Sequence, residues 1–149
     1  MEVYEAVLVG RASAMAVTSA FSGIEEQTSW NGDVIGGEWT TGTPGSAQAE
    51  RRIRLTRGMW QNQRLLTVEP GVRVEYEMLE GGGGMPFESG SRIDVRVHAQ
   101  EGGLVEVRFT FYYRLTFAYR LMAPIVRRMA RANLDASLPR LFESPPERR

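Results

Sequence analysis

The sequence predicts an α+β protein in which a curved antiparallel sheet of six to seven strands wraps around one long C-terminal helix. Three observations support this fold class. From about residue 50 to residue 115, apolar and polar residues alternate, which is typical of strands with one solvated face. Residues 118–143 carry apolar side chains at helical spacing. Two short helical segments follow the first strand, so the helices flank the sheet in the chain instead of alternating with its strands.

The N-terminal part predicts one strand and two short helices. Val3 to Val9 is an apolar, β-branched run that favours a strand. Ser13 is placed to cap a helix that ends at Gly23. Residues 24–29 then predict a second short helix, and residues 33–39 a weak strand before a turn rich in Gly, Thr and Pro.

Five further strands are predicted over residues 50–57, 60–69, 72–79, 91–99 and 105–115. In residues 72–79 and 91–99 the side chains of one parity are apolar or aromatic and those of the other mainly charged, which indicates a half-solvated antiparallel sheet. We expect the charged parity to form cross-strand ion pairs on the solvated face, from Glu50, Arg52, Arg54, Glu75, Glu77, Glu106 and Arg108.

The last quarter of the chain, Ala118 to Glu143, predicts an amphipathic helix. Leu121, Ile125 and Met129 recur at four-residue spacing, and Pro124 suits a first-turn position. The apolar stripe is widened by Val126, Leu134, Leu138 and Leu141, while Arg127, Arg128 and Arg131 lie mostly on the other side. We expect one domain over residues 1–143 and a frayed polar tail over 144–149. One helix cannot fill a strongly curved sheet near its ends, so we also expect a cavity between them.

Composition excludes several classes of function. A chain of 149 residues is one domain with room for a core, and its formal net charge of zero gives no field that favours nucleic acid. All 18 basic residues are arginine, which fits a coding bias better than a function. The absence of cysteine and the single histidine rule out disulfides, thiolate catalysis and multi-histidine metal sites. No targeting or membrane-spanning segment is visible, so we expect a cytoplasmic location and no stable membrane insertion.

Three segments resemble the START-like helix-grip superfamily, and within it the polyketide cyclase/dehydrase-type branch. They are residues 9–21 with Trp30-Asn31-Gly32, then Glu50-Arg51-Arg52 with Gly58 and 64–69, and finally 133–141. Two positions depart from the family pattern: Ala12-Ser13 stands where Ala-Pro is usual, and Gln63 where Glu is common. The resemblance spans nearly the whole chain and implies the fold. It does not fix the function, because the family includes carriers, cyclases, dehydratases, condensing enzymes and chaperone-like regulators.

Arg51 is the first candidate for chemistry. It shares strand parity with Ile53 and Leu55, so it should point toward the helix, and a buried guanidinium needs a partner. An inward arginine commonly meets a substrate carbonyl or enolate in this family, and its donors suit a developing oxyanion. The alternative is an internal ion pair with Glu50 or Glu5, or a side chain that snorkels at the sheet edge.

Aromatic and sulfur-containing side chains of the apolar parity are the other candidates. Tyr76 and Tyr113 are placed to orient a carbonyl or pass a proton, and the alternative is a core tyrosine with a backbone partner. Contact with an apolar ligand is expected from the side chains of Trp30, Trp60, Met78, Phe109, Phe111, Met122, Ile125 and Met129, for which plain core packing is the alternative.

Two other features, His98 and the glycine run, are weaker indications of function. His98 is the only residue that titrates near neutrality, yet its parity matches that of Asp94 and Arg96, so it should face solvent. Gly81–Gly84 lacks the Lys-Ser/Thr of a phosphate loop and is expected to form a flexible flap over one end of the cavity.

The function expected from the residues and the resemblance is binding of a hydrophobic small molecule, such as a polyketide, lipid or aromatic compound. The leading hypothesis is a cofactor-independent cyclase, aromatase or dehydratase in which Arg51 polarises a carbonyl and Tyr113 or Tyr76 moves protons. A non-catalytic carrier is the alternative, and a groove for a protein partner is the third. No metal or other cofactor and no nucleic acid are expected, and the chain is expected to be a monomer or a homodimer.

Overall fold

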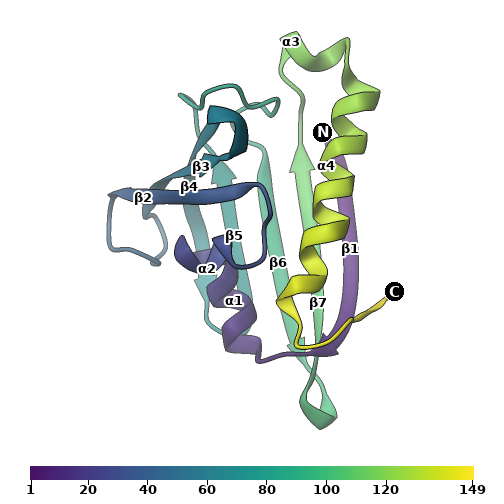
Figure 1. Cartoon of the computed structure of the whole chain (residues 1–149). Coiled ribbons are helices and arrows are strands. Elements are labelled where there is room, and N and C mark those ends of the chain that lie inside the picture. Colours follow the sequence, from purple (N-terminus) through teal and green to yellow (C-terminus); the bar gives the residue numbers. More distant parts are fainter.

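The computed structural model describes residues 1–149 as one antiparallel sheet of eight strands with helices on one of its faces (Figure 1). The strand order is β2-β3-β4-β5-β6-β7-β1-β8. The strands are β1 (Glu2–Arg11), β2 (Val34–Thr41), β3 (Glu50–Leu55), β4 (Trp60–Glu69), β5 (Arg73–Met78), β6 (Arg92–Ala99), β7 (Leu104–Tyr113) and β8 (Glu147–Arg148). The helices are α1 (Ala14–Ser22), α2 (Glu25–Thr28), α3 (Phe117–Arg120) and α4 (Ala123–Ser137). The predicted fold class is confirmed, with eight strands instead of six to seven.

Alternation along the strands divides the sheet into a covered face and a solvated face, as predicted. On β5, for example, Val74, Tyr76 and Met78 are buried, whereas Arg73, Glu75 and Glu77 are partly exposed. The buried side chains of β1 and β4 to β7 join those of α1 and of the chain's C-terminal part in one continuous core. The sheet therefore has a concave, apolar face under the helices, and any internal site must lie there.

The pair α1–α2 covers the β4–β6 side of the sheet, and its ends form as the sequence predicts. The Ala16 backbone N–H donates to Ser13 Oγ at 3.3 Å, which is an N-cap. At the other end the Gly23 N–H donates to the Ser19 carbonyl at 2.9 Å. The chain then turns sharply into α2.

The segment predicted as one C-terminal helix, Ala118–Glu143, contains three elements. Helix α3 ends at Arg120, α4 starts at Ala123, and a 3-10 turn over Leu138–Leu141 follows α4. Pro124 explains the first break, because proline lacks an N–H and its ring collides with the carbonyl four residues earlier, here that of Arg120. Proline is tolerated in the first turn of α4, where it now lies. Helix α4 covers β7 and β1 (Figure 1). No helix of the chain is long and apolar enough to cross a membrane.

The last six residues differ from the expectation of a frayed tail. Residues Glu147–Arg148 form β8, which pairs with Leu8 and Val9 of β1, and the Arg149 N–H donates to the Val7 carbonyl at 2.8 Å. Free backbone groups at the edge of β1 provide the partners that a tail in solvent would lack. Gly10 permits the approach of the C-terminal segment, since a Cβ at this position would lie 2.7 Å from the Phe142 ring.

Candidate functional site

A pocket of about 400 Å³ opens at the end of the sheet where β4, β5 and the glycine loop meet. Gln61 and Met78 project into it from buried positions of β4 and β5. The loop between β5 and β6 and the chain before α3 complete the lining with Met85, Phe87, Glu88 and Thr116, among others. The Phe87 ring packs edge-on against Phe111 and Tyr113, at 5.0 and 5.5 Å between ring centroids. The pocket is therefore continuous with the aromatic end of the core.

The loop Gly81–Gly84 at the rim of this pocket is fixed by hydrogen bonds. Trp60 and Gly83 exchange two backbone hydrogen bonds of 3.1 and 2.9 Å. The Trp60 indole N–H donates to the Gly81 carbonyl at 3.1 Å, and the Tyr119 hydroxyl donates to the Gly84 carbonyl at 3.1 Å. A Cβ on Gly83 would lie 2.4 Å from the Trp60 ring. These contacts tie the predicted flap to Trp60 and Tyr119, and at Gly83 glycine is required because an indole lies against its backbone.

Arg51 lies where strand parity predicts, on the covered face of β3, and it is fully buried. Its guanidinium donates to four acceptors, none of which is a carboxylate. The Nε–H donates to Gln63 Oε1 at 2.9 Å, and the terminal nitrogens donate to the carbonyls of Phe21 (3.0 Å), Ser22 (3.2 Å) and Gly23 (3.3 Å). These carbonyls end α1, where the helix dipole favours a cation. Arg51 therefore holds the α1–α2 corner against the sheet, and neither predicted ion pair forms.

Aromatic rings complete the surroundings of this buried cation. The guanidinium carbon lies 4.9 Å from the Tyr76 ring centroid and 5.7 Å from that of Trp39, within the range of a cation–π contact. Burial lowers the pKa of Arg51 to about 10, an effect that interaction with Tyr76 partly opposes. The group remains charged at neutral pH. The interior thus carries a positive charge balanced by carbonyl dipoles and ring faces.

Two glutamines that the sequence analysis did not select extend from Arg51 to the pocket. Gln63 accepts from Arg51 through Oε1, and its Nε2 donates to Gln61 Oε1 at 2.6 Å. Both glutamines are buried. The sequence offered little signal for them: Gln61 and Gln63 share the parity of Leu65 in β4, but the same row continues with the polar Thr67 and Glu69.

The two predicted catalytic tyrosines lie on the covered face but are enclosed. Tyr76 is 2 % exposed, and its hydroxyl accepts from Gln27 Nε2 at 3.3 Å. Burial raises the pKa of Tyr76 to about 12. Tyr113 is 3 % exposed, and burial together with the charge of Glu2 raises its pKa, against the opposing effect of Arg127 and Arg131. Neither phenol lies among the residues that line the pocket.

The predicted ligand-contacting residues fall into four groups. Met78 lines the pocket. Trp30, Phe109 and Phe111 are core residues, and the Trp30 indole donates to the Ala20 carbonyl at 2.8 Å. Trp60 has the outward parity of β4 and contacts the glycine loop. The remaining three lie on the first half of the C-terminal helix and its N-cap and are about half exposed: Met122, Ile125 and Met129.

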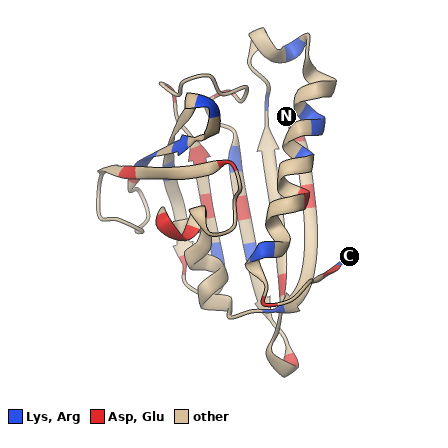
Figure 2. Ribbon diagram, viewed as in Figure 1, with Lys and Arg blue, Asp and Glu red and all other residues tan.

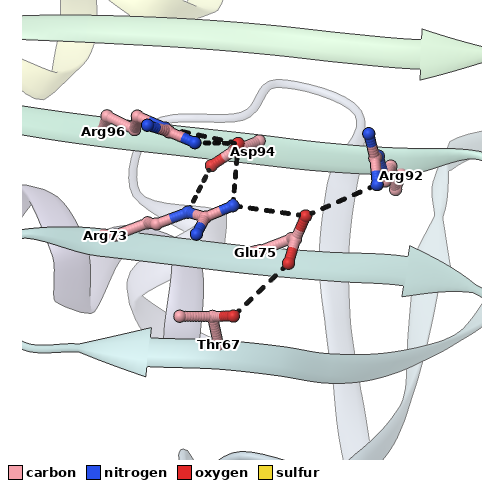
Figure 3. A network of polar contacts seen from close by, with 6 residues as sticks. All are labelled: Thr67, Arg73, Glu75, Arg92, Asp94 and Arg96. Atoms are coloured by element: carbon pink, nitrogen blue, oxygen red, sulfur yellow. Dashed lines mark hydrogen bonds and ion pairs between the residues drawn. The ribbon is translucent and has the colours of Figure 1, made fainter.

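The opposite face of the sheet carries the predicted charge ladder (Figure 3). Arg73 of β5 makes a two-point contact with Asp94 of β6, with N–O distances of 3.0 and 3.1 Å. Arg73 also lies 3.5 Å from Glu75, which accepts from the Thr67 hydroxyl at 3.3 Å. His98 is exposed on this face, as its parity predicts. Charged residues of both signs are spread over the strands and α4 in Figure 2, and no cluster of three or more His, Asp or Glu side chains has metal-site geometry.

The fold and the site define a helix-grip α+β protein with a small pocket at one end of its sheet, lined by both apolar and polar residues. Comparison with protein families identifies the group: residues 1–142 match the family described as polyketide cyclase/dehydrase and lipid transport, and the chain belongs to it. This confirms the resemblance to the START-like superfamily.

Solved structures share the fold at low sequence identity. A START superfamily protein from Mycobacterium smegmatis has a TM-score of 0.74 at 12 % identity, over 93 % of each chain. Protein XoxI from Bacillus cereus has a TM-score of 0.73 at 13 % identity, over 96 % of this chain and 94 % of the other. Norcoclaurine synthase from Thalictrum has a TM-score of 0.64 at 15 % identity, over 94 % of each chain. No curated protein matches the sequence at a significant level.

Proposed function

We propose that the protein binds an apolar small molecule of the polyketide, lipid or aromatic kind in the pocket beside the glycine loop, and carries it without changing it. The observation that carries this proposal is the pocket itself. Its volume of about 400 Å³ falls in the range of small-molecule sites, and Met78, Met85 and Phe87 supply apolar walls. Gln61 and Thr116 supply polar groups beside them. Membership of a family described by lipid transport as well as cyclisation supports the same conclusion.

Binding without catalysis is favoured because the groups predicted to react are engaged elsewhere. Arg51 directs its donors at Gln63 and at the end of α1, so a substrate oxyanion would have to displace backbone carbonyls. Tyr76 is enclosed by the core. In the pocket, Glu88 is paired with Arg120 at 3.3 Å and with Arg114 at 3.9 Å. The cyclase, aromatase or dehydratase hypothesis requires one of these contacts to open.

A fluorescence titration tests the proposal. The probe is 11-(dansylamino)undecanoic acid, and one-to-one saturable binding is expected. Met85→Trp fills the pocket from its loop wall and should weaken binding about tenfold or more, which corresponds to about 1.4 kcal/mol. Val72→Trp is the matched control, because Val72 is 53 % exposed and lines a hollow on the other face of the sheet. Val72→Trp should leave the affinity unchanged.

Absence of saturable binding, or equal weakening by both substitutions, would overturn the pocket assignment. Catalysis is tested separately by incubating the protein with a linear poly-β-ketone and recovering the compound for mass spectrometry. A carrier returns it unchanged relative to a protein-free sample. Accelerated loss of water in the presence of the protein would instead support the cyclase or dehydratase hypothesis.

A further inference from the structure

We infer that the pocket selects ligands that present a hydrogen-bond acceptor, such as a carbonyl or carboxylate oxygen, and that the side-chain amide N–H of Gln61 is the group that recognises it. This inference rests on the proposed function, since it concerns the ligand of the same pocket. The inference adds which partner of the hydrogen bond the protein supplies: the protein donates and the ligand accepts. The argument follows the row Arg51, Gln63, Gln61 from the core outward.

Arg51 sets the orientation of the first amide. A guanidinium has five N–H donors and no acceptor, so the group that meets its Nε–H must be an oxygen. Gln63 therefore presents Oε1 to Arg51, at 2.9 Å, and must direct its Nε2 away. The α1 carbonyls hold Arg51 in place, because Phe21, Ser22 and Gly23 each accept from it. Burial keeps water from competing for these contacts.

Gln63 then sets the orientation of the second amide. Its Nε2 can only donate, so Gln61 presents Oε1 to it, at 2.6 Å. The NH₂ group of Gln61 is left at the free end of the row. No protein atom accepts a hydrogen bond from it, and it is not among the enclosed side-chain atoms that lack a partner. Since Gln61 lines the pocket, this accessible donor is available to a bound molecule.

The direction of the row decides which ligands are favoured. A molecule that places a carbonyl or carboxylate oxygen against the Gln61 NH₂ group gains a hydrogen bond. A molecule that presents only N–H groups there forms none, because both groups are donors. A hydrocarbon of the same shape leaves the amide without a partner when it excludes water, which costs affinity. Arg51 is then a positioning residue: it touches no ligand but fixes the polarity of the pocket through two amides.

A matched pair of probes tests this selectivity. 2-Acetylnaphthalene and 2-ethylnaphthalene have the same aromatic body and nearly the same side chain, and only the first has an acceptor. Their affinities are measured by competition with 11-(dansylamino)undecanoic acid. The wild-type protein should prefer the ketone, and Gln61→Leu should reduce the ketone-to-hydrocarbon affinity ratio by about threefold to tenfold, the usual worth of one hydrogen bond. Taking a ratio cancels changes in pocket shape that affect both probes.

Two further variants separate recognition from general damage to the site. Gln61→Glu keeps an oxygen that accepts from Gln63 but replaces the free NH₂ by a second acceptor, so the ratio should fall below that of Gln61→Leu. Gln63→Leu leaves Gln61 intact but frees its orientation, so the ratio should fall to an intermediate value. Urea unfolding of each variant verifies that it is folded under the assay conditions.

The outcomes of this experiment and of the pocket test are distinguishable. If the dansyl probe does not bind, the proposed function fails. If the dansyl probe binds but the wild-type protein does not prefer the ketone, including the case in which neither naphthalene competes, the pocket stands and the Gln61 inference is overturned. An unchanged ratio in Gln61→Glu would overturn it equally.

Discussion

The apolar side chains in the two halves of α4 have different surroundings. In the second half, Leu134 and Ser137 are buried, and Leu138 just beyond the helix is 1 % exposed. In the first half, Ile125 and Met129 are 55 % and 51 % exposed. At about 100° per residue, the nine residue steps from Ile125 to Leu134 make about two and a half turns. The two side chains therefore point to opposite sides of the helix.

The polar contacts also differ between the two halves of α4. The second half is linked to β1 and β8 through Asp135, which accepts from the Tyr4 hydroxyl at 2.5 Å and from Arg148 at 2.6 Å. It is also linked to the turn after α2, where Asn133 donates to Asn31 at 3.3 Å and the Gly32 N–H donates to Ser137 Oγ. In the first half the ion pair is Arg127 with Glu2. The residues predicted as one apolar stripe thus lie on two sides of the helix, and the side with Leu134 is the one that is buried.

The largest effect that tests the difference between the two halves of α4 is expected from shortening one apolar side chain in each half. Leu134→Ala removes buried methyl groups and leaves a cavity, so the free energy of unfolding should fall by about 2–5 kcal/mol. Ile125→Ala removes a similar volume from an exposed position and should change it by about 0.5 kcal/mol or less. Urea denaturation followed by circular dichroism measures both. Equal losses would mean that the first half of α4 is covered in solution.

A smaller effect is expected at the Tyr4–Asp135 contact. Tyr4→Phe removes the hydrogen bond that the hydroxyl donates to Asp135 and the longer one, 3.4 Å, that it accepts from Arg148, and should cost about 0.5–1.5 kcal/mol near neutral pH. Burial, and then the hydrogen bond to Asp135, raise the pKa of Tyr4 from 10.0 to about 12. A raised folded-state pKa gives stability that is complete below pH 10.0 and is lost as the pH rises through about 12. The difference between wild type and Tyr4→Phe should therefore shrink between these values. A difference that grows over this range in urea titrations would contradict the assignment.

The smallest effect is expected when an apolar side chain on the exposed side of α4 is replaced by a polar one. Met129→Gln on the first half should leave the free energy of unfolding within about 0.5 kcal/mol of wild type, because the side chain is already in contact with water. Ala130→Gln, one position further along the same helix, faces the partly covered side and serves as the comparison. Thermal unfolding of the pair suffices. A larger loss for Met129→Gln than for Ala130→Gln would reverse our description of the helix faces.

Most of the fold was predictable because it depends on local patterns. The period of two identified β5, β6 and β7, Ser13 and Gly23 marked the ends of α1, and Trp60–Glu69 is a strand with the predicted bounds. The break before α4 was harder to place, since Pro124 is compatible with the first turn of a helix as well as with its interruption. The ordered tail depends on backbone groups at the far edge of β1, about which residues 144–149 carry no information.

The site was less predictable than the fold, because it depends on which groups each side chain contacts in the folded protein. Parity placed Arg51, Tyr76 and Tyr113 on the covered face, but it cannot show that backbone carbonyls at the end of α1 would meet the guanidinium. Gln61 and Gln63 were visible in the same row and acquire meaning only once Arg51 has an orientation. The lining from the loop after β5, including Met85 and Phe87, has no periodicity from which it could be inferred.

The contacts of Arg51 also decide how the protein should respond to acid. Every acceptor that holds the guanidinium is an amide or a peptide carbonyl, and none of these takes up a proton in moderately acidic solution. Among the polar contacts of the second half of α4, those of Asp135 respond to acid, because hydrogen bonds to Tyr4 and Arg148 lower the pKa of this carboxylate despite the opposing effect of burial. Its contribution is present above its ordinary pKa and disappears as the pH falls further. Acid should therefore weaken the attachment of the C-terminal helix to β1 and β8 before it weakens that of α1 to β3.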